Sequence, residues 1–264
     1  MILAALMWVG CTPDQRTSEA VVPLRIAAAA DLKFALDTLI AETQLPFPVE
    51  VVYGSSGNLR TQIEHGAPFD LFLSADMRFP KILVEKGLAE EATLFRYAVG
   101  RLVIWVPNES PLDVERLREQ VLREPGVRKI AVANPQHAPY GQAAVAALQT
   151  FGLLDTVQAK FVLGENIAQT AQFVESGAAD VGILALSLAV APAMRDQGRF
   201  WEIPLETFPR MEQGGVITNH ATRSGQREAA VTLRQVMLAP EGRAVLRRYG
   251  FIMPEATGPQ DAAN

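Results

Sequence analysis

The stretch VVYGSSGNLR carries two hydroxyl side chains, Ser55 and Ser56, between two glycines. A β-like run precedes this turn and a helix-like pattern follows it, so the serines lie where a strand passes into a helix. The first N–H groups of a helix have no partner within the helix and carry about half a positive charge. Hydroxyl groups beside such N–H groups could bind an anion.

Three other turns share this arrangement, in which an apolar strand runs into a small or polar turn that begins a helix. They are Ala30-Asp31, Ala138-Pro139-Tyr140-Gly141 and Glu165-Asn166-Ile167. In parallel α/β sheets, ligands bind beyond the carboxyl ends of the strands, where helix N-termini also gather. Each turn alone is explained as well by an ordinary helix cap worth about 0.5–2 kcal/mol, so the prediction of an anion site depends on all four together.

The charge of the chain excludes some partners and permits this kind of site. The sequence has 29 acidic and 24 basic residues, a net charge of −5, and no block of five like charges, which argues against nucleic acid. A cage of backbone N–H groups and hydroxyls needs no lysine or arginine. We expect it to hold a fully deprotonated tetrahedral oxyanion, because a protonated ligand would find no acceptor.

The apolar pattern predicts an α/β fold with mostly parallel strands flanked by helices. We expect Asp31 to cap the first helix, Gly66 to end the second in the left-handed conformation, and Gly87 to end the third. One amphipathic helix is expected over residues 114–122. The expected strands cover residues 24–30, 49–54, 69–75, 101–107, 200–204 and 214–218, and two strand–loop–helix units cover residues 128–152 and 159–186. Two further helices are expected over residues 226–238 and 240–250.

The N-terminal segment MILAALMWVGC ends in Cys11, the only cysteine of the chain, so no internal disulfide can form. This segment resembles a lipoprotein signal peptide, whose cysteine becomes the lipidated first residue of the mature protein. Trp8 and the lack of a preceding Lys or Arg depart from that pattern. We expect export to the periplasm and lipid anchoring through Cys11, with an ordinary unmodified cysteine as the alternative.

Several segments, in this order and spacing, resemble the periplasmic molybdate-binding proteins of ABC importers. They are AAAADLKFAL, YGSSGNLRTQIEHGAPFDLFLSAD, YAVGRLVIW, ANPQHAPYGQAA, ESGAADVGILAL and PEGRAVLRRYGF. The resemblance implies a two-lobed type II periplasmic-binding-protein fold that closes on its ligand. It implies a first lobe of residues 24–102 plus 217–256, a second lobe of residues 103–216, a leader of residues 1–23 and a flexible tail of residues 257–264.

The resemblance also implies the ligand contacts. Molybdate or tungstate would be held through Ala30 and Asp31 of the first turn, Ser56 and also Ser55 of the second, Tyr140 of the third and the backbone of Ile167. Tyr140 would donate its phenol or its amide, in place of a tyrosine that some relatives have where this chain has Ala185.

Asp31 departs from the family pattern, in which that position is generally neutral, because a carboxylate close to a divalent anion repels it. Three interpretations stay open: its side chain caps the helix and points away, it is protonated in the closed site, or it coordinates the metal directly. We favour the cap. Glu165 raises the same question less sharply.

Other functions remain as alternatives. Catalysis would need a nucleophile with its base, but GSSG is not the Gly-x-Ser-x-Gly elbow and His65 lies at the far end of the helix that Ser56 begins. A transcriptional regulator would need a DNA-binding segment before Leu24. Within the binding class, sulfate or another tetrahedral oxyanion is the alternative ligand. We expect a monomeric, non-enzymatic solute-binding subunit, without a cofactor, that delivers molybdate and tungstate to an ABC permease in the inner membrane.

Overall fold

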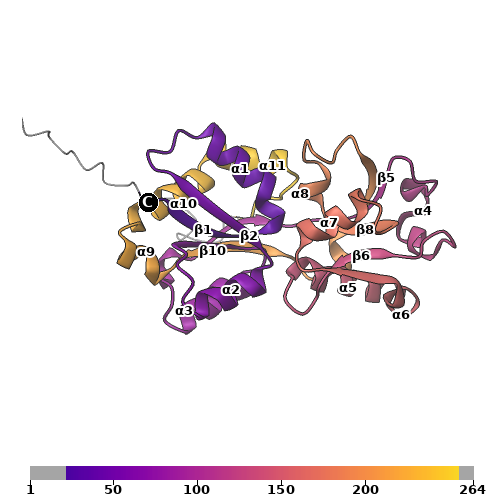
Figure 1. Cartoon of the computed structure of the whole chain (residues 1–264), viewed down its shortest axis with the longest axis horizontal. Helices are drawn as coiled ribbons and strands as arrows, with labels where there is room; N and C mark the ends of the chain where they lie inside the picture. Colours follow the sequence, from indigo (N-terminus) through magenta and orange to yellow (C-terminus); the bar gives the residue numbers. More distant parts are fainter. Residues whose placement is uncertain (1–21, 256–264) are drawn as a thin grey trace, which may run out of the picture.

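Two five-stranded sheets, each flanked by helices, organise residues 22–255, which the computed structural model describes (Figure 1). Lobe I is built on the sheet with strand order β2-β1-β3-β10-β4, and lobe II on the sheet with order β7-β6-β8-β5-β9. We use lobe I for residues 22–100 and 212–255, and lobe II for residues 101–211. The expectations about the leader, Cys11 and the tail concern residues outside the described range.

The strands of lobe I are β1 (Leu24–Ala29), β2 (Val49–Gly54), β3 (Leu71–Ser74), β4 (Phe95–Val99) and β10 (Glu212–Ile217). The strands of lobe II are β5 (Leu102–Pro107), β6 (Ile130–Ala133), β7 (Phe161–Gly164), β8 (Val181–Ala185) and β9 (Gly198–Glu202). Each sheet is mixed, since β10 runs antiparallel to β3 and β4, and β5 runs antiparallel to β8 and β9. The expectation of mostly parallel sheets therefore holds only for the β2-β1-β3 and β7-β6-β8 halves.

Helices cover both sheets. In lobe I they are α1 (Lys33–Glu42), α2 (Ser56–Glu64), α3 (Arg78–Glu85), α9 (Asn219–Ser224), α10 (Arg227–Leu238) and α11 (Pro240–Arg248). In lobe II they are α4 (Val114–Leu117), α5 (Pro139–Thr150), α6 (Leu154–Val157), α7 (Ile167–Glu175) and α8 (Leu186–Ala189). Short 3₁₀ segments are η1 (Ala30–Leu32), η2 (Glu91–Thr93), η3 (Arg118–Arg123), η4 (Gln158–Lys160) and η5 (Leu205–Thr207).

The chain crosses between the lobes twice. The first crossing is the short link between β4 and β5, residues 100–101, and the second is the segment between β9 and β10, residues 203–211. The expected boundary between residues 216 and 217 lies one strand too late, because β10 pairs with β3 and β4 of lobe I.

Buried strands with apolar residues on both faces form the centre of each lobe. All four residues of β3 and all but the last residue of β5 are buried, as their continuous apolar runs predict. Ala29, Ala30 and Ala75 of lobe I belong to the buried cluster that forms the core of lobe II. The two cores therefore meet at the carboxyl ends of β1 and β3.

Some of the predicted helix boundaries are confirmed and others are wrong. Gly66 has a φ of +88°, the left-handed conformation predicted for it, and Gly87, predicted to end its helix, has a φ of +66°. The amphipathic helix expected over residues 114–122 is instead the four-residue α4 followed by η3, with Arg118 at a φ of +53° where they join. The Asp31 cap is also wrong: Asp31 lies inside η1, and neither η1 nor α1 has a side-chain cap.

Candidate functional site

One small cavity between the lobes is lined by residues from all four predicted turns. Lobe I contributes the β1–η1 junction, the β2–α2 junction and the residue after β3, whereas lobe II contributes the starts of α5 and α7. The lining residues are Ala29, Ala30, Asp31, Gly54, Ser55, Ser56, Ala75, Ala138, Pro139, Tyr140 and Ile167. The fold thus brings together all six residues that the sequence pointed to.

The cavity is very small in this arrangement of the lobes. Its volume of about 10 Å³ is close to the least that holds one water molecule. A tetrahedral oxyanion is larger than water, so its entry requires the lobes to move apart. Contacts across the lobe boundary therefore control access to the cavity.

Ser56 offers a hydroxyl hydrogen to the cavity. It is the first residue of α2 and is 1% exposed, and its Oγ accepts a hydrogen bond from the N–H of Ala75 at 3.0 Å. Because that bond uses a lone pair, the O–H of Ser56 remains available to donate. Its position at a helix N-terminus adds the favourable field of the helix dipole.

Ser55 has a different environment, at the contact between the lobes. Its Oγ lies 2.9 Å from His137 Nδ1 and caps α2 by accepting from the N–H of Asn58 at 3.4 Å. Beside it, the N–H of Gly57 donates to the carbonyl oxygen of His137 at 2.9 Å. A Cβ on Gly57 would lie 2.6 Å from that oxygen, so glycine permits this close approach of lobe I to lobe II.

Lobe II contributes backbone groups to the cavity. Pro139 begins α5 and has no N–H, so the N–H of Tyr140 is the first that this helix offers. Asn166 caps α7 by accepting from the N–H groups of Ala168 and Gln169, each at 3.0 Å. The N–H of Ile167, the first residue of α7, lies outside that cap and has no partner within the helix.

Asp31 is buried at the boundary between the lobes, with 1% exposure. Its Oδ2 accepts from the Tyr140 hydroxyl at 3.0 Å and from Gln213 Nε2 at 2.7 Å. Burial raises the pKa of Asp31 from 3.8 to about 6, although the hydrogen bonds from Gln213 and Tyr140 and the nearby backbone N–H groups act to lower it. The Tyr140 phenol is therefore turned to Asp31, which leaves its amide as the group nearest to an anion.

Two residues of this arrangement were not predicted from the sequence. Gln213, on β10, contacts both Asp31 and the Tyr140 hydroxyl, the latter at 3.1 Å. Ser187 of α8 donates its hydroxyl to the carbonyl oxygen of Asp31 at 2.7 Å. Gln213 is fully buried, and a glutamine directly before the run Gly214–Ile217 is the sequence feature that could have drawn attention to it.

The fold and these turns match a known family. The family model for bacterial extracellular solute-binding proteins matches residues 24–252. The chain belongs to this family of solute-binding proteins.

Individual relatives agree with that assignment. The molybdate-binding protein ModA of Rhodobacter capsulatus is 33% identical over 205 residues, which cover 77% of each chain. ModA of Azotobacter vinelandii is 31% identical over 230 residues, 86% of this chain and 89% of that one. The solved structure of the Azotobacter vinelandii periplasmic molybdate-binding protein superposes with a TM-score of 0.79 at 32% identity, covering 88% of this chain and all of that chain.

Glu165, His65 and His220 of this solute-binding protein lie away from the cavity lining, whereas His137 contacts the lining residue Ser55. Glu165 is exposed and accepts from Asn58 Nδ2 of lobe I at 3.3 Å, so it contacts the opposite lobe. His65 contacts the carbonyl oxygen of Thr61, and His220 contacts the buried Asp70. Among the hydrogen bonds of residues 22–255, none places a histidine on Ser56, as a nucleophile would need.

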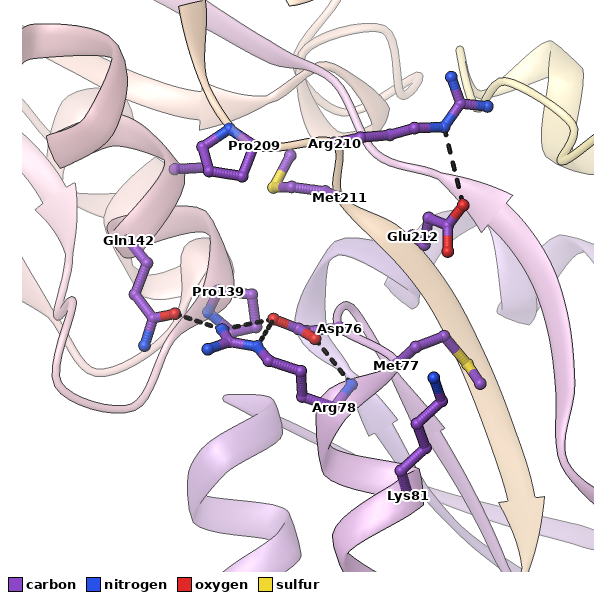
Figure 2. A pocket seen from close by; sticks show the side chains of 11 residues that line it. Asp76, Met77, Arg78, Lys81, Pro139, Gln142, Pro209, Arg210, Met211 and Glu212 are labelled. Carbon is purple, nitrogen blue, oxygen red and sulfur yellow. Dashed lines mark hydrogen bonds and ion pairs between the residues drawn. The ribbon is translucent and has the colours of Figure 1, made fainter. Parts of the chain in front are cut away.

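A larger groove of about 600 Å³ lies beside the cavity, between α3, the start of α5 and residues 209–212 (Figure 2). In Figure 2, Arg78 of lobe I lies between Asp76 and Gln142, and its guanidinium donates to Gln142 Oε1 of lobe II at 2.7 Å. The groove carries charges of both signs, from Asp76 and Glu212 and from Arg78, Lys81 and Arg210. Such a lining does not select a small anion, and it separates this groove from the cavity lined by the helix starts.

Residues 22–255 lack both a metal-ligand cluster and a membrane-spanning helix. No cluster of three or more His, Cys, Asp or Glu side chains there could hold a metal ion. No helix in this part of the chain is long and apolar enough to cross a lipid bilayer.

Proposed function

We propose that this solute-binding protein captures molybdate, and tungstate through the same contacts, and delivers the anion to the permease of an ABC importer. The observation that carries the proposal is the cavity whose lining combines the Ser56 hydroxyl with the first N–H groups of α5 and α7. These donors are neutral and fixed in direction, so they replace the water around a dianion without a counter-ion. The molybdate-binding relatives give the choice of anion.

Affinity in such a site comes from several donors acting together. A hydrogen bond to a charged group contributes about 1.5–3 kcal/mol, and after the costs of binding we expect a dissociation constant on the order of 10⁻⁶ to 10⁻⁹ M. The donors come from both lobes and converge only when the lobes are closed. The ligand therefore favours the closed form, which the permease would recognise as loaded.

Calorimetric titration with three anions tests the proposal. We expect molybdate and tungstate to bind in the range given above, and sulfate to bind more weakly because the relatives with this arrangement of turns are molybdate-binding proteins. If sulfate bound more tightly than molybdate, sulfate would be identified as the ligand instead. No heat with any of the three anions would refute the proposal.

We further propose that the protein acts as a monomer in the periplasm, anchored by lipid on Cys11. The apolar segment that ends in Cys11 supports the anchor. Mass spectrometry of the full chain recovered from bacterial membranes should find an N-terminal diacylglyceryl cysteine, and the Cys11→Ser variant should be found unanchored. An unmodified Cys11 in the mature protein would exclude lipidation.

A further inference from the structure

Asp31 brings to the cavity a hydrogen-bond acceptor that an anion site made only of donors would lack. Its Oδ2 is used by Tyr140 and Gln213, whereas its Oδ1 is buried without a hydrogen-bond partner among the described residues. Asp31 also lines the cavity. A buried carboxylate oxygen without a partner is costly, so this oxygen calls for a proton or a donor.

Within residues 22–255, no cation that could neutralise Asp31 acts on its carboxyl group. The titratable groups that face it are the Tyr140 phenol on α5 and the Tyr97 phenol on β4, and the Asp31 charge helps to raise the pKa of both. α7, α8 and β10 present the uncharged Ile167, Ser187 and Gln213. Lys33, two residues further along the chain, places its ammonium group 3.3 Å from Asp37 Oδ2 at the surface.

An oxyanion in the same cavity would add a second negative charge next to this carboxylate. Two like charges a few ångströms apart in a low-dielectric site repel strongly, and the repulsion is relieved when the carboxyl group takes up a proton. Burial already raises the pKa of Asp31 to about 6. Near neutral pH, a small further rise in this pKa is therefore enough for the carboxylate to take up a proton.

We infer that the site binds one oxyanion together with one proton, which is shared between Asp31 Oδ1 and a ligand oxygen. The inference rests on the proposed function. The proton comes from solvent when the ligand is fully deprotonated, and it arrives with the ligand when the ligand is a singly protonated oxyanion. Asp31 thereby becomes a determinant of specificity, since the complete complex requires one O–H···O bridge besides the N–H and hydroxyl donors.

Proton uptake makes the affinity depend on pH. Above the pKa of the unliganded carboxyl group, each bound dianion must recruit one proton, so the dissociation constant rises towards tenfold per pH unit. Below that pKa the proton is already present, and the affinity levels off. Asp31→Asn imitates the protonated carboxyl group in shape and neutrality, so it should bind molybdate with little dependence on pH.

Calorimetry counts the proton directly. The purified protein is titrated with sodium molybdate at pH 8 in HEPES and in Tris, whose ionisation enthalpies differ, and again at pH 7 and pH 9. We expect the wild type to take up close to one proton per anion and Asp31→Asn to take up none. Asp155→Asn changes an exposed carboxylate in α6 and should behave as the wild type.

The outcomes separate this inference from the proposed function. Tight molybdate binding by the wild type with no net proton uptake overturns the inference and leaves the proposed function intact. A pH dependence that persists in Asp31→Asn also overturns it. Absence of binding by all three oxyanions overturns both. The wild-type proton count needs no variant, so the test stands even if Asp31→Asn folds poorly.

Discussion

The two lobes contribute unlike chemistry to the same cavity. Lobe I supplies side chains that can donate or hold a proton, namely the Ser56 hydroxyl and the Asp31 carboxyl group. Lobe II supplies the backbone N–H groups of Tyr140 and Ile167, while its polar side chains are engaged elsewhere. Backbone groups cannot be changed by mutation without moving the helix, so specificity should respond to changes in lobe I and closure to changes at the boundary.

The largest effect is expected for the carboxyl group of lobe I. A pKa raised from 3.8 to about 6 means that folded Asp31 keeps its proton to higher pH than the unfolded chain does. This difference changes the free energy of unfolding by about 3 kcal/mol between low and high pH. That stability is present below pH 4 and is lost as the pH rises through 6. Thermal unfolding without ligand should show Asp31→Asn gaining stability relative to the wild type between pH 4 and pH 7. If the stability difference between Asp31→Asn and the wild type did not change with pH, Asp31 would not be desolvated in the folded protein.

The hydroxyl of lobe I comes next. Ser56→Ala should weaken molybdate binding by about 1.5–3 kcal/mol, the loss of one hydrogen bond to a charged ligand. Calorimetric titration measures it, and Ser176→Ala, which removes an exposed hydroxyl after α7, serves as the control. Equal affinity of the Ser56 variant and the wild type would remove Ser56 from the site.

At the boundary, Gly57→Ala tests closure without altering a ligand contact. The new Cβ would lie 2.6 Å from the carbonyl oxygen of His137. Such overpacking typically destabilises the packed arrangement, here the closed lobes, by about 1–3 kcal/mol. We expect a lower affinity through faster ligand release, measured by stopped-flow. Gly126→Ala, where a Cβ meets nothing within 4 Å, is the matched control.

The smallest effect is expected for the one lobe II side chain that was predicted to bind. Tyr140→Phe removes a phenol that donates to Asp31, so the affinity should change by only about 0.5–1.5 kcal/mol. A loss of a hundredfold or more in titration would instead place the phenol on the anion and contradict the division between the lobes.

Local sequence patterns predicted the turns but not the partners of their side chains. Helix starts at Ser56, Pro139 and Ile167 follow from capping residues and proline placement, which act within a few residues. The Asp31 environment depends on Gln213, which is 182 residues away in sequence, and no local pattern encodes that contact. The Asp31 cap prediction was wrong for this reason, because burial against a distant strand outweighed local capping.

The mixed sheets escaped prediction for a related reason. The apolar run of β5 and the Gly-Gly-Val-Ile end of β10 indicate that these strands are buried, but burial does not reveal strand direction. Direction is set by where the chain crosses between the lobes, at residues 100–101 and 203–211. The site was less affected, since the parallel half of each sheet carries the four turns.

The two donors to Asp31 Oδ2 come from opposite lobes, Gln213 from lobe I and Tyr140 from lobe II. When the lobes part, Gln213 travels with the carboxyl group, whereas the phenol departs and bulk water replaces it. Hydration returns the pKa of Asp31 to the usual value of an aspartate, so the open form releases a proton together with the bound anion. Discharge at the membrane would thus acidify its immediate surroundings by one equivalent for each anion handed over.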